Sequence, residues 1–407
     1  MSQWISPKQW EILKFPFRKD YNALICDGAV RSGKTSFTTI AFIDWAMREF
    51  DKTNFAICGR SFESVVRNVI MPYMALTYHR NKYFIKWVRS TGRLTVRSAV
   101  RENTFLVFGG GDESKFALIQ GLTAAGILFD EVALQVQSFV EEALARCLTF
   151  ENRKYWFNCN PQSPEHWFYK EWIQQPEKHK ALYLHFTMHD NPILTDEVRE
   201  QAANDFSGVF YERKVLGLWV LAEGLIYPHY KDAIVKTEDR AYTEYQISAD
   251  YGISNPMAFA LFGYCDGVWY MVDEYYHSGR DTNQQKIDED YLQDLKKFVG
   301  AAKISRVIVD PSALSFINLL RRSGWMIKRA DNDVLNGISD TATALKTGKM
   351  KINDRCRNAL KEFSLYSWDN KAKGEDRPIK EHDHIMDSLR YFVYTNKIVR
   401  GPARLLG

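Results

Sequence analysis

The sequence predicts an α/β protein with two domains. Its 407 residues exceed one domain of ordinary size, which holds roughly 150 residues. In the first half, short apolar strands alternate with helical stretches, a pattern typical of a mostly parallel sheet with helices on both faces. In the second half, three strands come in succession before helices and strands alternate. The patterns break at residues 226–243, which we interpret as a linker between domains at 1–225 and 244–407.

The elements of the first domain follow from apolar runs bounded by turn residues. Strands are expected at residues 23–26, 55–58, 91–96, 104–108, 126–129 and 155–158. Helices are expected at residues 34–50, 61–81, 138–148 and 196–220.

The second domain begins with strands at 245–250, 257–264 and 268–275, the last two joined by Asp266-Gly267, a type I′ hairpin signal. A helix at 282–300, a strand at 306–310, and helices at 312–323 and 383–395 follow. This order is that of a ribonuclease-H-like fold.

Composition excludes several classes of protein. Hydrophobic residues make up 45% and charged residues 26%, as in ordinary globular proteins. No apolar run approaches the ~18 residues of a membrane helix, and the N-terminus MSQWISPKQW lacks the features of a secretory signal. The six cysteines are widely spaced without a CxxC pair, which indicates free thiols in a reducing cytoplasm.

The distribution of charge is uneven. Residues 51–100 and residues 321–407 each sum to +7, whereas residues 101–320 sum to −12. Two basic blocks around an acidic middle suit a protein that grips a polyanion in two places. Such clusters also occur as solvated faces, so charge alone does not decide between these interpretations.

A complete phosphate-binding motif lies between a predicted strand and a predicted helix. GAVRSGKT fits the pattern GxxxxGK(S/T), in which backbone N–H groups cradle phosphates at a helix N-terminus. The lysine then reaches the β- and γ-phosphates, and the threonine hydroxyl binds Mg²⁺. The predicted ATP-binding residues are Gly28, Ala29, Val30, Arg31, Ser32, Gly33, Lys34 and Thr35.

A second motif completes the nucleotide site. The strand GILF ends in Asp130 and Glu131, the Walker B arrangement. We expect Asp130 to hold Mg²⁺ and Glu131 to polarise the attacking water. With the P-loop upstream, this predicts ATP hydrolysis.

Four further residues are weaker candidates for this site. Gln9 lies where adenine-reading glutamines occur, although a solvated glutamine fits the pattern too. Asn160 follows a strand, so its side chain senses the γ-phosphate or forms a turn before proline. Transferred phosphoryl groups usually need an arginine, for which Arg31 and Arg146 are candidates. Surface salt bridges are the alternative role for both arginines.

Three aspartates of the second domain are expected to converge. Asp250 and Asp310 end strands that neighbour each other in a ribonuclease-H-like sheet. Asp387 shares one face of the last helix with Asp383 and His384. Oxygen ligands of this kind hold two Mg²⁺ or Mn²⁺ ions in phosphodiesterase sites. Unrelated carboxylates at element ends are the alternative, and Glu274 is a fourth candidate ligand.

Together these motifs resemble the large terminase subunit of tailed double-stranded DNA bacteriophages. The resemblance runs from GAVRSGKT, GILFDEV and NCNP through ADYG and VIVDPS to DHIMDSLRY, and so covers nearly the whole chain. It implies a P-loop ATPase domain joined to a ribonuclease-H-like nuclease domain. The implied function is ATP-driven translocation of double-stranded DNA into the procapsid and metal-dependent cleavage of concatemeric DNA.

The resemblance also implies residue roles, cofactors and partners. Asn160 takes the coupling role, and Asp250, Asp310 and Asp387 bind the nuclease metals, with His384 as a further ligand or helper. The cofactors are ATP and Mg²⁺ (or Mn²⁺), with one ion at the ATPase site and two at the nuclease site. The implied partners are sequence-nonspecific double-stranded DNA, the portal protein, the small terminase subunit and further copies in a ring, in the host cell cytoplasm and with no membrane.

Two other functions are compatible with some of these features. A P-loop helicase or repair nuclease would carry further helicase motifs, of which we find no convincing set. A structural subunit whose second domain only docks onto the portal would not need three placed carboxylates.

Replacing Lys34 with alanine tests the P-loop assignment. We expect the Lys34→Ala variant to lose ATP hydrolysis, because a required phosphate contact is removed, and to keep metal-dependent nicking of DNA, because the carboxylates lie in the other domain. ATPase and nicking assays check both outcomes. Hydrolysis near the normal rate would contradict the assignment.

Overall fold

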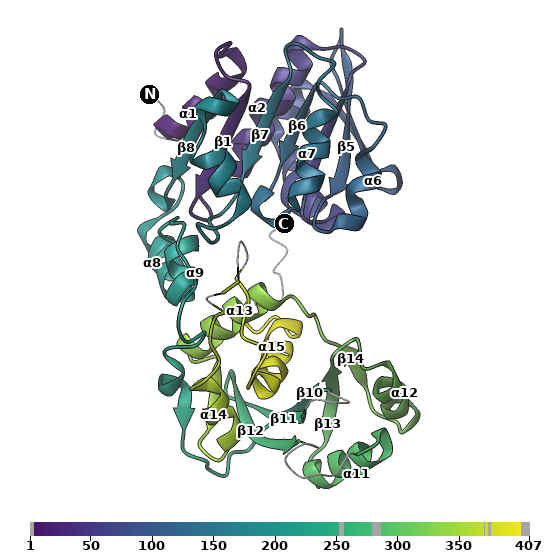
Figure 1. The fold of residues 1–407 in the computed structure, drawn as a ribbon, viewed down its shortest axis with the longest axis vertical. Helices are drawn as coiled ribbons and strands as arrows, with labels where there is room; N and C mark the ends of the chain where they lie inside the picture. Colours follow the sequence, from purple (N-terminus) through teal and green to yellow (C-terminus); the bar gives the residue numbers. More distant parts are fainter. Residues whose placement is uncertain (1–3, 252–255, 279–285, 370, 373–375, 400–407) are drawn as a thin grey trace. The chain divides into compact units, whose positions relative to one another are not determined.

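The chain forms two compact units. The structure, a computed structural model, describes residues 4–251, 256–278, 286–369, 371–372 and 376–399 (Figure 1). Within these ranges, the first unit comprises residues 4–200 and Tyr211–Leu221, and the second comprises Gln201–Phe210, 222–372 and 376–399. No helix in the described part of the chain is long and apolar enough to cross a membrane.

The first unit is built on a sheet of eight strands in the order β3-β4-β5-β2-β6-β7-β1-β8. The strands from β5 to β8 in this order pair in parallel, and β3 and β4 add an antiparallel hairpin at one edge. The bounds are β1 (Ala23–Gly28), β2 (Asn54–Gly59), β3 (Phe84–Val88), β4 (Arg93–Arg97), β5 (Glu102–Gly109), β6 (Gly126–Phe129), β7 (Lys154–Asn158) and β8 (Ala181–Phe186).

Helices cover both faces of this sheet, as the sequence predicts. On one face α1, α2 and α4 pack over the strands, and α7 packs on the other. The helices of this unit are α1 (Pro7–Lys14), α2 (Lys34–Glu49), α3 (Phe62–Val65), α4 (Met71–Ala75), α5 (Thr77–Lys82), α6 (Phe116–Ile119) and α7 (Gln137–Ala145). Helices α8 (Asp196–Asp205) and α9 (Gly208–Lys214) each contribute residues to both units. Short helical turns are η1 (Phe15–Phe17), η2 (Val66–Ile70), η3 (Arg89–Thr91), η4 (Glu113–Lys115), η5 (Val132–Leu134), η6 (Tyr169–Ile173), η7 (Glu177–His179) and η8 (Met188–Asp190).

The second unit is built on a mixed sheet in the order β14-β13-β10-β11-β12-β15-β9. Its first three long strands form an antiparallel meander, and β13 then pairs in parallel with β10, as in a ribonuclease-H-like fold. The bounds are β9 (Ile234–Val235), β10 (Glu244–Asp250), β11 (Met257–Cys265), β12 (Val268–His277), β13 (Ile304–Val309), β14 (Ile327–Arg329) and β15 (Met350–Asn353). The predicted hairpin is confirmed, since Asp266 and Gly267 both have positive φ, 49° and 82°.

The helices of the second unit also cover both faces of their sheet. Helices α13, α14 and α15 pack on one face, and α11 and α12 pack on the other. Their bounds are η9 (Tyr230–Ala233), α11 (Asp288–Val299), α12 (Leu314–Arg322), α13 (Val334–Lys346), α14 (Arg357–Phe363) and α15 (His384–Thr395). Part of the helix predicted at 282–300 lies outside the described residues, and α11 begins at Asp288.

Several elements differ from those predicted. Strands β3 and β8 were not predicted, although their sequences, FIKWV and ALYLHF, are largely apolar. The helix expected at 61–81 is a series of short pieces, and the one at 196–220 is two helices followed by irregular chain. The segment 226–243, expected as a linker, packs into the second unit, because Ile226 and Tyr227 are buried in its core and β9 pairs with β15.

Trp156 lies at the centre of an aromatic cluster in the first unit. Its ring centroid is 4.9 Å from those of Phe42 and Trp45 and 5.1 Å from that of Phe15. We expect Trp156→Ala to lower the free energy of unfolding by about 3–5 kcal/mol, because it leaves a large cavity. The exposed Trp4 supplies the control, since Trp4→Ala should change stability by less than ~0.5 kcal/mol. Scanning calorimetry of the full chain measures both, and equal losses would contradict the prediction.

Candidate functional site

The P-loop residues form the turn between β1 and α2. Gly28 has a φ of 116°, and a Cβ at this position would lie 1.9 Å from the carbonyl oxygen of Phe186. Gly33 precedes α2 with a φ of 86°. Because both positions lie in the left-handed region and Gly28 has no space for a side chain, the sequence requires glycine for this turn.

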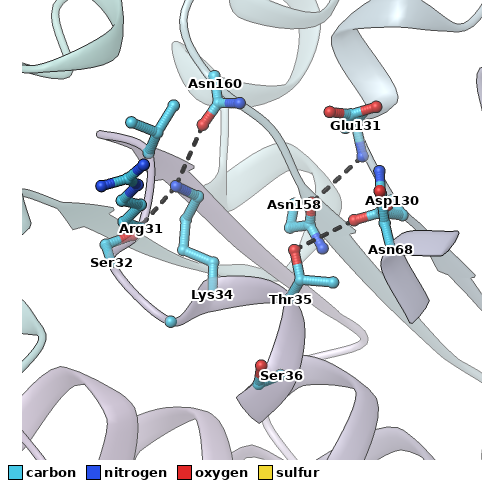
Figure 2. Close-up of a pocket in the computed structure, with 12 residues that line it drawn as sticks. Arg31, Ser32, Lys34, Thr35, Ser36, Asn68, Asp130, Glu131, Asn158 and Asn160 are labelled. Atoms are coloured by element: carbon cyan, nitrogen blue, oxygen red, sulfur yellow. Dashed lines mark hydrogen bonds between the residues drawn. The ribbon is translucent and has the colours of Figure 1, made fainter. Parts of the chain in front are cut away.

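Lys34 points back into the P-loop (Figure 2). Its Nζ donates hydrogen bonds to the carbonyl oxygens of Gly28 at 3.0 Å and Ala29 at 2.6 Å, and to Ser32 Oγ at 3.1 Å. It also lies 3.4 Å from Asn160 Oδ1. Burial lowers the pKa of Lys34 to about 8. The ammonium group is therefore held by neutral oxygens, where an anionic phosphate would be a stronger partner.

Thr35 and Asp130 meet across the same pocket. The Thr35 hydroxyl donates a hydrogen bond of 3.2 Å to Asp130 Oδ1. Asp130 is buried, and this burial raises the pKa of its carboxyl group. A hydroxyl and a carboxylate are hard oxygen donors of the kind that Mg²⁺ prefers, so the donor set fits the predicted ion.

Glu131 takes a left-handed backbone conformation with a φ of 55°. Its backbone N–H donates a hydrogen bond of 3.2 Å to Asn158 Oδ1. Burial, together with the charge of Asp130, raises the pKa of Glu131 to about 7. Asn158 was not assigned a role from the sequence; the parallel register of Phe129 with Phe157 is what places it beside the Walker B residues.

The remaining candidates lie at different distances from this pocket. The pocket has a volume of about 250 Å³ and is lined by Val30, Arg31, Ser32, Gly33, Lys34, Thr35, Ser36, Asn68, Asp130, Glu131, Asn158 and Asn160. Arg31 and Asn160 are therefore both at the pocket. Gln9 is buried rather than solvated, and its Nε2 donates a hydrogen bond of 3.3 Å to the carbonyl oxygen of Ser32. Gln9 therefore stabilises the P-loop backbone and does not line the pocket.

Arg146 is not brought to this pocket. Its backbone carbonyl accepts a hydrogen bond from Ala124, which precedes β6, whereas Asp130 follows β6. Arg146 thus lies at the opposite end of the strand, where its side chain pairs with Glu142 at 2.8 Å. This position does not support the prediction that Arg146 acts in the ATPase site. The sequence could not show this, because the helical pattern of α7 does not indicate which end of the helix faces the P-loop.

The second unit brings Asp250 and Asp310 together at adjacent strand ends. In the parallel register of β10 and β13, Ala249 pairs with Val309, so both aspartates follow at the same edge of the sheet. His384 Nδ1 lies 2.9 Å from Asp250 Oδ2. Burial and the nearby charge of Asp387 raise the pKa of Asp250 to about 6, although the hydrogen bond with His384 opposes this shift.

Asp310 and Asp387 are linked by side chains that the sequence did not single out. The Asp387 Oδ1 atom accepts hydrogen bonds from Nε and Nη2 of Arg390, at 3.1 and 2.9 Å. Arg390 also donates to Asn332, whose Nδ2 donates to Asp310 Oδ2 at 3.0 Å. Tyr391 donates a hydrogen bond of 2.7 Å to the same Asp310 oxygen. Burial alone would raise the pKa of Asp310. Hydrogen bonds from Ser312 and Tyr391 outweigh this effect, so the pKa of Asp310 is lowered overall.

These contacts involve one or both carboxylate oxygens of each aspartate that was predicted to bind metal ions. Among the described residues, no group of three or more His, Cys, Asp or Glu side chains is placed to hold one ion. Arg390, Asn332, Tyr391 and His384 each bond to an oxygen of one of the three aspartates. The carboxylates have the donor chemistry for Mg²⁺ or Mn²⁺, but the structure does not converge them on one point.

Glu274 is not part of this group. Its carboxylate accepts hydrogen bonds from the backbone N–H groups of Asn358 and Ala359 in the first turn of α14. It therefore caps a helix.

Comparisons with known proteins agree on one family. The family model described as "Terminase large subunit, T4likevirus-type, N-terminal" matches residues 25–231. The large terminase of a thermophilic bacteriophage, solved in complex with ADP, is 44% identical, with 96% of this chain and 99% of that chain covered and a TM-score of 0.91. The chain belongs to the large terminase family.

Two further structures of the same thermophilic phage protein give the same result. Crystal form 2 is 44% identical, with 96% of this chain and 98% of that chain covered and a TM-score of 0.93. The complex with ATP-γ-S is 43% identical over the same shares, with a TM-score of 0.90. A search of curated proteins found no match.

As a large terminase, the protein is a DNA-packaging motor subunit with ATPase and nuclease activities. The two units have the folds that these activities require, a P-loop sheet and a ribonuclease-H-like sheet. The motifs alone also allowed a helicase or a repair nuclease. Membership of the large terminase family favours the packaging function over these two.

The position of Glu131 generates a prediction for the ATPase. We expect Glu131→Gln to bind ATP but to hydrolyse it roughly 10²–10⁴-fold more slowly, because an amide keeps the shape of the side chain without acting as a base. Steady-state hydrolysis and nucleotide-binding assays measure this. Glu141→Gln, an exposed change on α7, is the control and should keep the normal rate. A large loss in Asp130→Asn with none in Glu131→Gln would reverse the two roles.

Proposed function

We propose that the pocket of the first unit binds and hydrolyses ATP to drive DNA translocation. The observation that carries this proposal is the meeting of Lys34, Thr35, Asp130 and Glu131 in one pocket lined by P-loop backbone. The large terminase of the thermophilic phage, which is 43–44% identical, was solved with ADP and with ATP-γ-S. That relative supports a nucleotide as the ligand of this pocket.

Each residue of the pocket has a defined part in the proposed reaction. Lys34 exchanges its carbonyl partners for the β- and γ-phosphates. Thr35 and Asp130 would hold Mg²⁺, which supplies positive charge to the phosphate oxygens when bound. Glu131 accepts a proton from the attacking water, and the hydrogen bond from its backbone to Asn158 fixes its position.

Two polar side chains extend this arrangement. Arg31 lines the pocket and is the proposed source of charge stabilisation for the transferred phosphoryl group. Asn160 contacts Lys34 directly, so a phosphate that displaces Lys34 also removes a partner of Asn160. This contact supports the proposed role of Asn160 in coupling hydrolysis to movement. Gln9 holds the P-loop backbone, and adenine recognition by Gln9 remains a prediction.

For the nuclease we propose that Asp250, Asp310 and Asp387 hold Mg²⁺ or Mn²⁺, with His384 as a helper. Two ions at this site, and one at the ATPase site, are the proposed numbers. Bound ions supply an activated water and stabilise the leaving oxygen. The adjacent strand ends of Asp250 and Asp310 support the assignment. Since Arg390 and Tyr391 bond to the same carboxylates, ions and these donors compete for the oxygens.

The proposed partners follow from the packaging function. We propose that the protein acts on double-stranded DNA without sequence preference and docks onto the portal protein as a ring of several copies. A small terminase subunit would select the DNA to be packaged. We propose the host cell cytoplasm as the place of action.

Metal binding provides the test of the nuclease proposal. Adding Mn²⁺ to the full chain should raise the melting temperature of the second unit, since an ion that binds only the folded form stabilises it. Asp250→Ala or Asp310→Ala should abolish both this rise and DNA cleavage while ATPase activity stays. Calorimetry and a nicking assay measure these effects.

The exposed Asp239, in the same unit, provides the matched control. Asp239→Ala should keep the Mn²⁺-dependent rise and the cleavage. Cleavage that survives Asp250→Ala, with an unchanged response to Mn²⁺, would show that these carboxylates are structural.

A further inference from the structure

The first basic block of the sequence becomes an exposed sheet surface. Strands β3, β4 and β5 pair antiparallel, with Phe84 opposite Arg97 and Lys86 opposite Thr95. Side chains alternate between the two faces of such a ladder. One face is buried, with Leu94 and Val96 in the core. The other face carries Lys86, Arg93 and Arg97, all exposed, and we call these three residues the cationic face.

The cationic face has no internal charge partners. None of its three side chains forms an ion pair with another residue in the part of the chain that the structure describes. Glu102 is the one acidic residue in the sequence of these three strands, and it stands opposite Arg97. The face thus keeps an excess of positive charge.

Other cations of the same sequence block are used within the protein. Arg89 is bonded to Glu63, and Lys82 to Asp44 at 2.9 Å. Arg101, which directly follows the block, donates a hydrogen bond of 3.2 Å to the carbonyl oxygen of Met47. The first two contacts explain two charges of the block structurally, and none of the three extends to the cationic face.

Protection of a sheet edge does not explain the cationic face either. Charged side chains on an edge strand prevent pairing with other chains. Strand β3 is an edge, which would account for Lys86. Strand β4 is paired on both sides, so Arg93 and Arg97 do not protect an edge.

An open polar pocket adjoins the cationic face at Arg97. It has a volume of about 620 Å³ and includes Arg80, Asn81 and Ser98. Arg80 is exposed and, like the cationic face, has no ion pair among the described residues. Two guanidinium groups with amide and hydroxyl donors suit a phosphate group, which accepts several hydrogen bonds at once.

The spacing of the two arginines suits a duplex backbone. Arg93 and Arg97 lie four residues apart on one face of β4, a separation of about 13 Å at the usual rise of a strand. The major groove of B-DNA is about 12 Å wide, so two such cations can reach phosphates on its two sides. The cationic face presents three separate single charges and few groups that could read base edges. It therefore suits contacts to the DNA phosphate backbone.

We propose that the cationic face, together with Arg80 at the adjoining pocket, binds the phosphate backbone of duplex DNA. This inference rests on the proposed action of the protein on double-stranded DNA. It assigns that binding to the antiparallel edge of the ATPase sheet, apart from the nucleotide pocket and from the carboxylates of the second unit.

The test measures binding of the full chain to a labelled DNA duplex at several salt concentrations. The triple variant Lys86→Gln, Arg93→Gln, Arg97→Gln should bind roughly 10- to 100-fold more weakly at moderate salt. The slope of log affinity against log salt concentration should be less steep by about 3, since each lost phosphate contact reduces the slope by about 1. A duplex of unrelated sequence should show the same losses.

The matched control removes three charges from the opposite edge of the same sheet. Lys19, Lys178 and Lys180 are exposed and lie before β1 and near β8. Their triple change to glutamine should leave the salt slope unchanged, because these residues are not expected to contact DNA. Single variants of the cationic face, each expected to lower the slope by about 1, replace the triple variant if calorimetry shows it to be unfolded.

The outcomes separate the two levels of the proposal. Failure of the wild-type chain to bind duplex DNA would overturn the proposed function itself. Normal DNA binding by the cationic-face variants, or an equal loss in the control, would overturn this surface alone. Loss of binding to an acidic protein partner with unchanged DNA affinity would reassign the face to that partner and likewise overturn the inference.

Discussion

Parallel pairing of neighbouring strands determines where both sites of the protein lie. In a parallel pair the carboxyl ends of the strands meet at one edge of the sheet. The register of β1 and β6 with β7 therefore sets the P-loop, Asp130 and Asn158 side by side. The register of β10 with β13 does the same for Asp250 and Asp310. A shift of either register by one residue would turn these side chains to the other face.

Burial then gives these side chains their chemical properties. Lys34, Asp130 and Glu131 are themselves largely buried at the pocket, so the charged form of each group loses contact with water. Burial therefore favours the neutral form of each group, and it shifts the pKa values of Lys34 and Glu131 toward 7. Groups whose pKa lies near 7 are suited to proton transfer at neutral pH, and such groups are common at active sites.

The sequence predicted the elements that carry strong local signals. The P-loop requires glycine at two left-handed positions, and the strand at 126–129 is a continuous apolar run, so the turn and this strand were predicted at the residues where the structure has them. The strand at 245–250 alternates apolar and polar residues, and it was predicted to within one residue of β10. Strand β14 was missed because it has only three residues, IKR, two of them charged. Strand β8, ALYLHF, was missed although its sequence is largely apolar.

Partners that meet only through the fold had no signal in the sequence. Asn332 lies 22 residues from Asp310 and 58 from Arg390, and nothing local links the three. The spacing of Asp387 and Arg390 by three residues is a common helical pair, so it did not mark the arginine as part of a site. Likewise, Gly224 and Pro228 indicated a break near residue 226, but not that Tyr227 and Tyr230 would enter a core.

The fully buried Arg390 has a mechanical consequence for the second unit. Gly337 on α13 makes room for it, since a Cβ there would lie 2.7 Å from Arg390 Cγ. One rigid guanidinium group thus joins Asp387 directly and Asp310 through Asn332. Because the guanidinium group is planar and rigid, turning it toward Asp387 or toward Asn332 would weaken its hydrogen bond to the other. A change at either aspartate would therefore disturb a hydrogen-bond chain that both share.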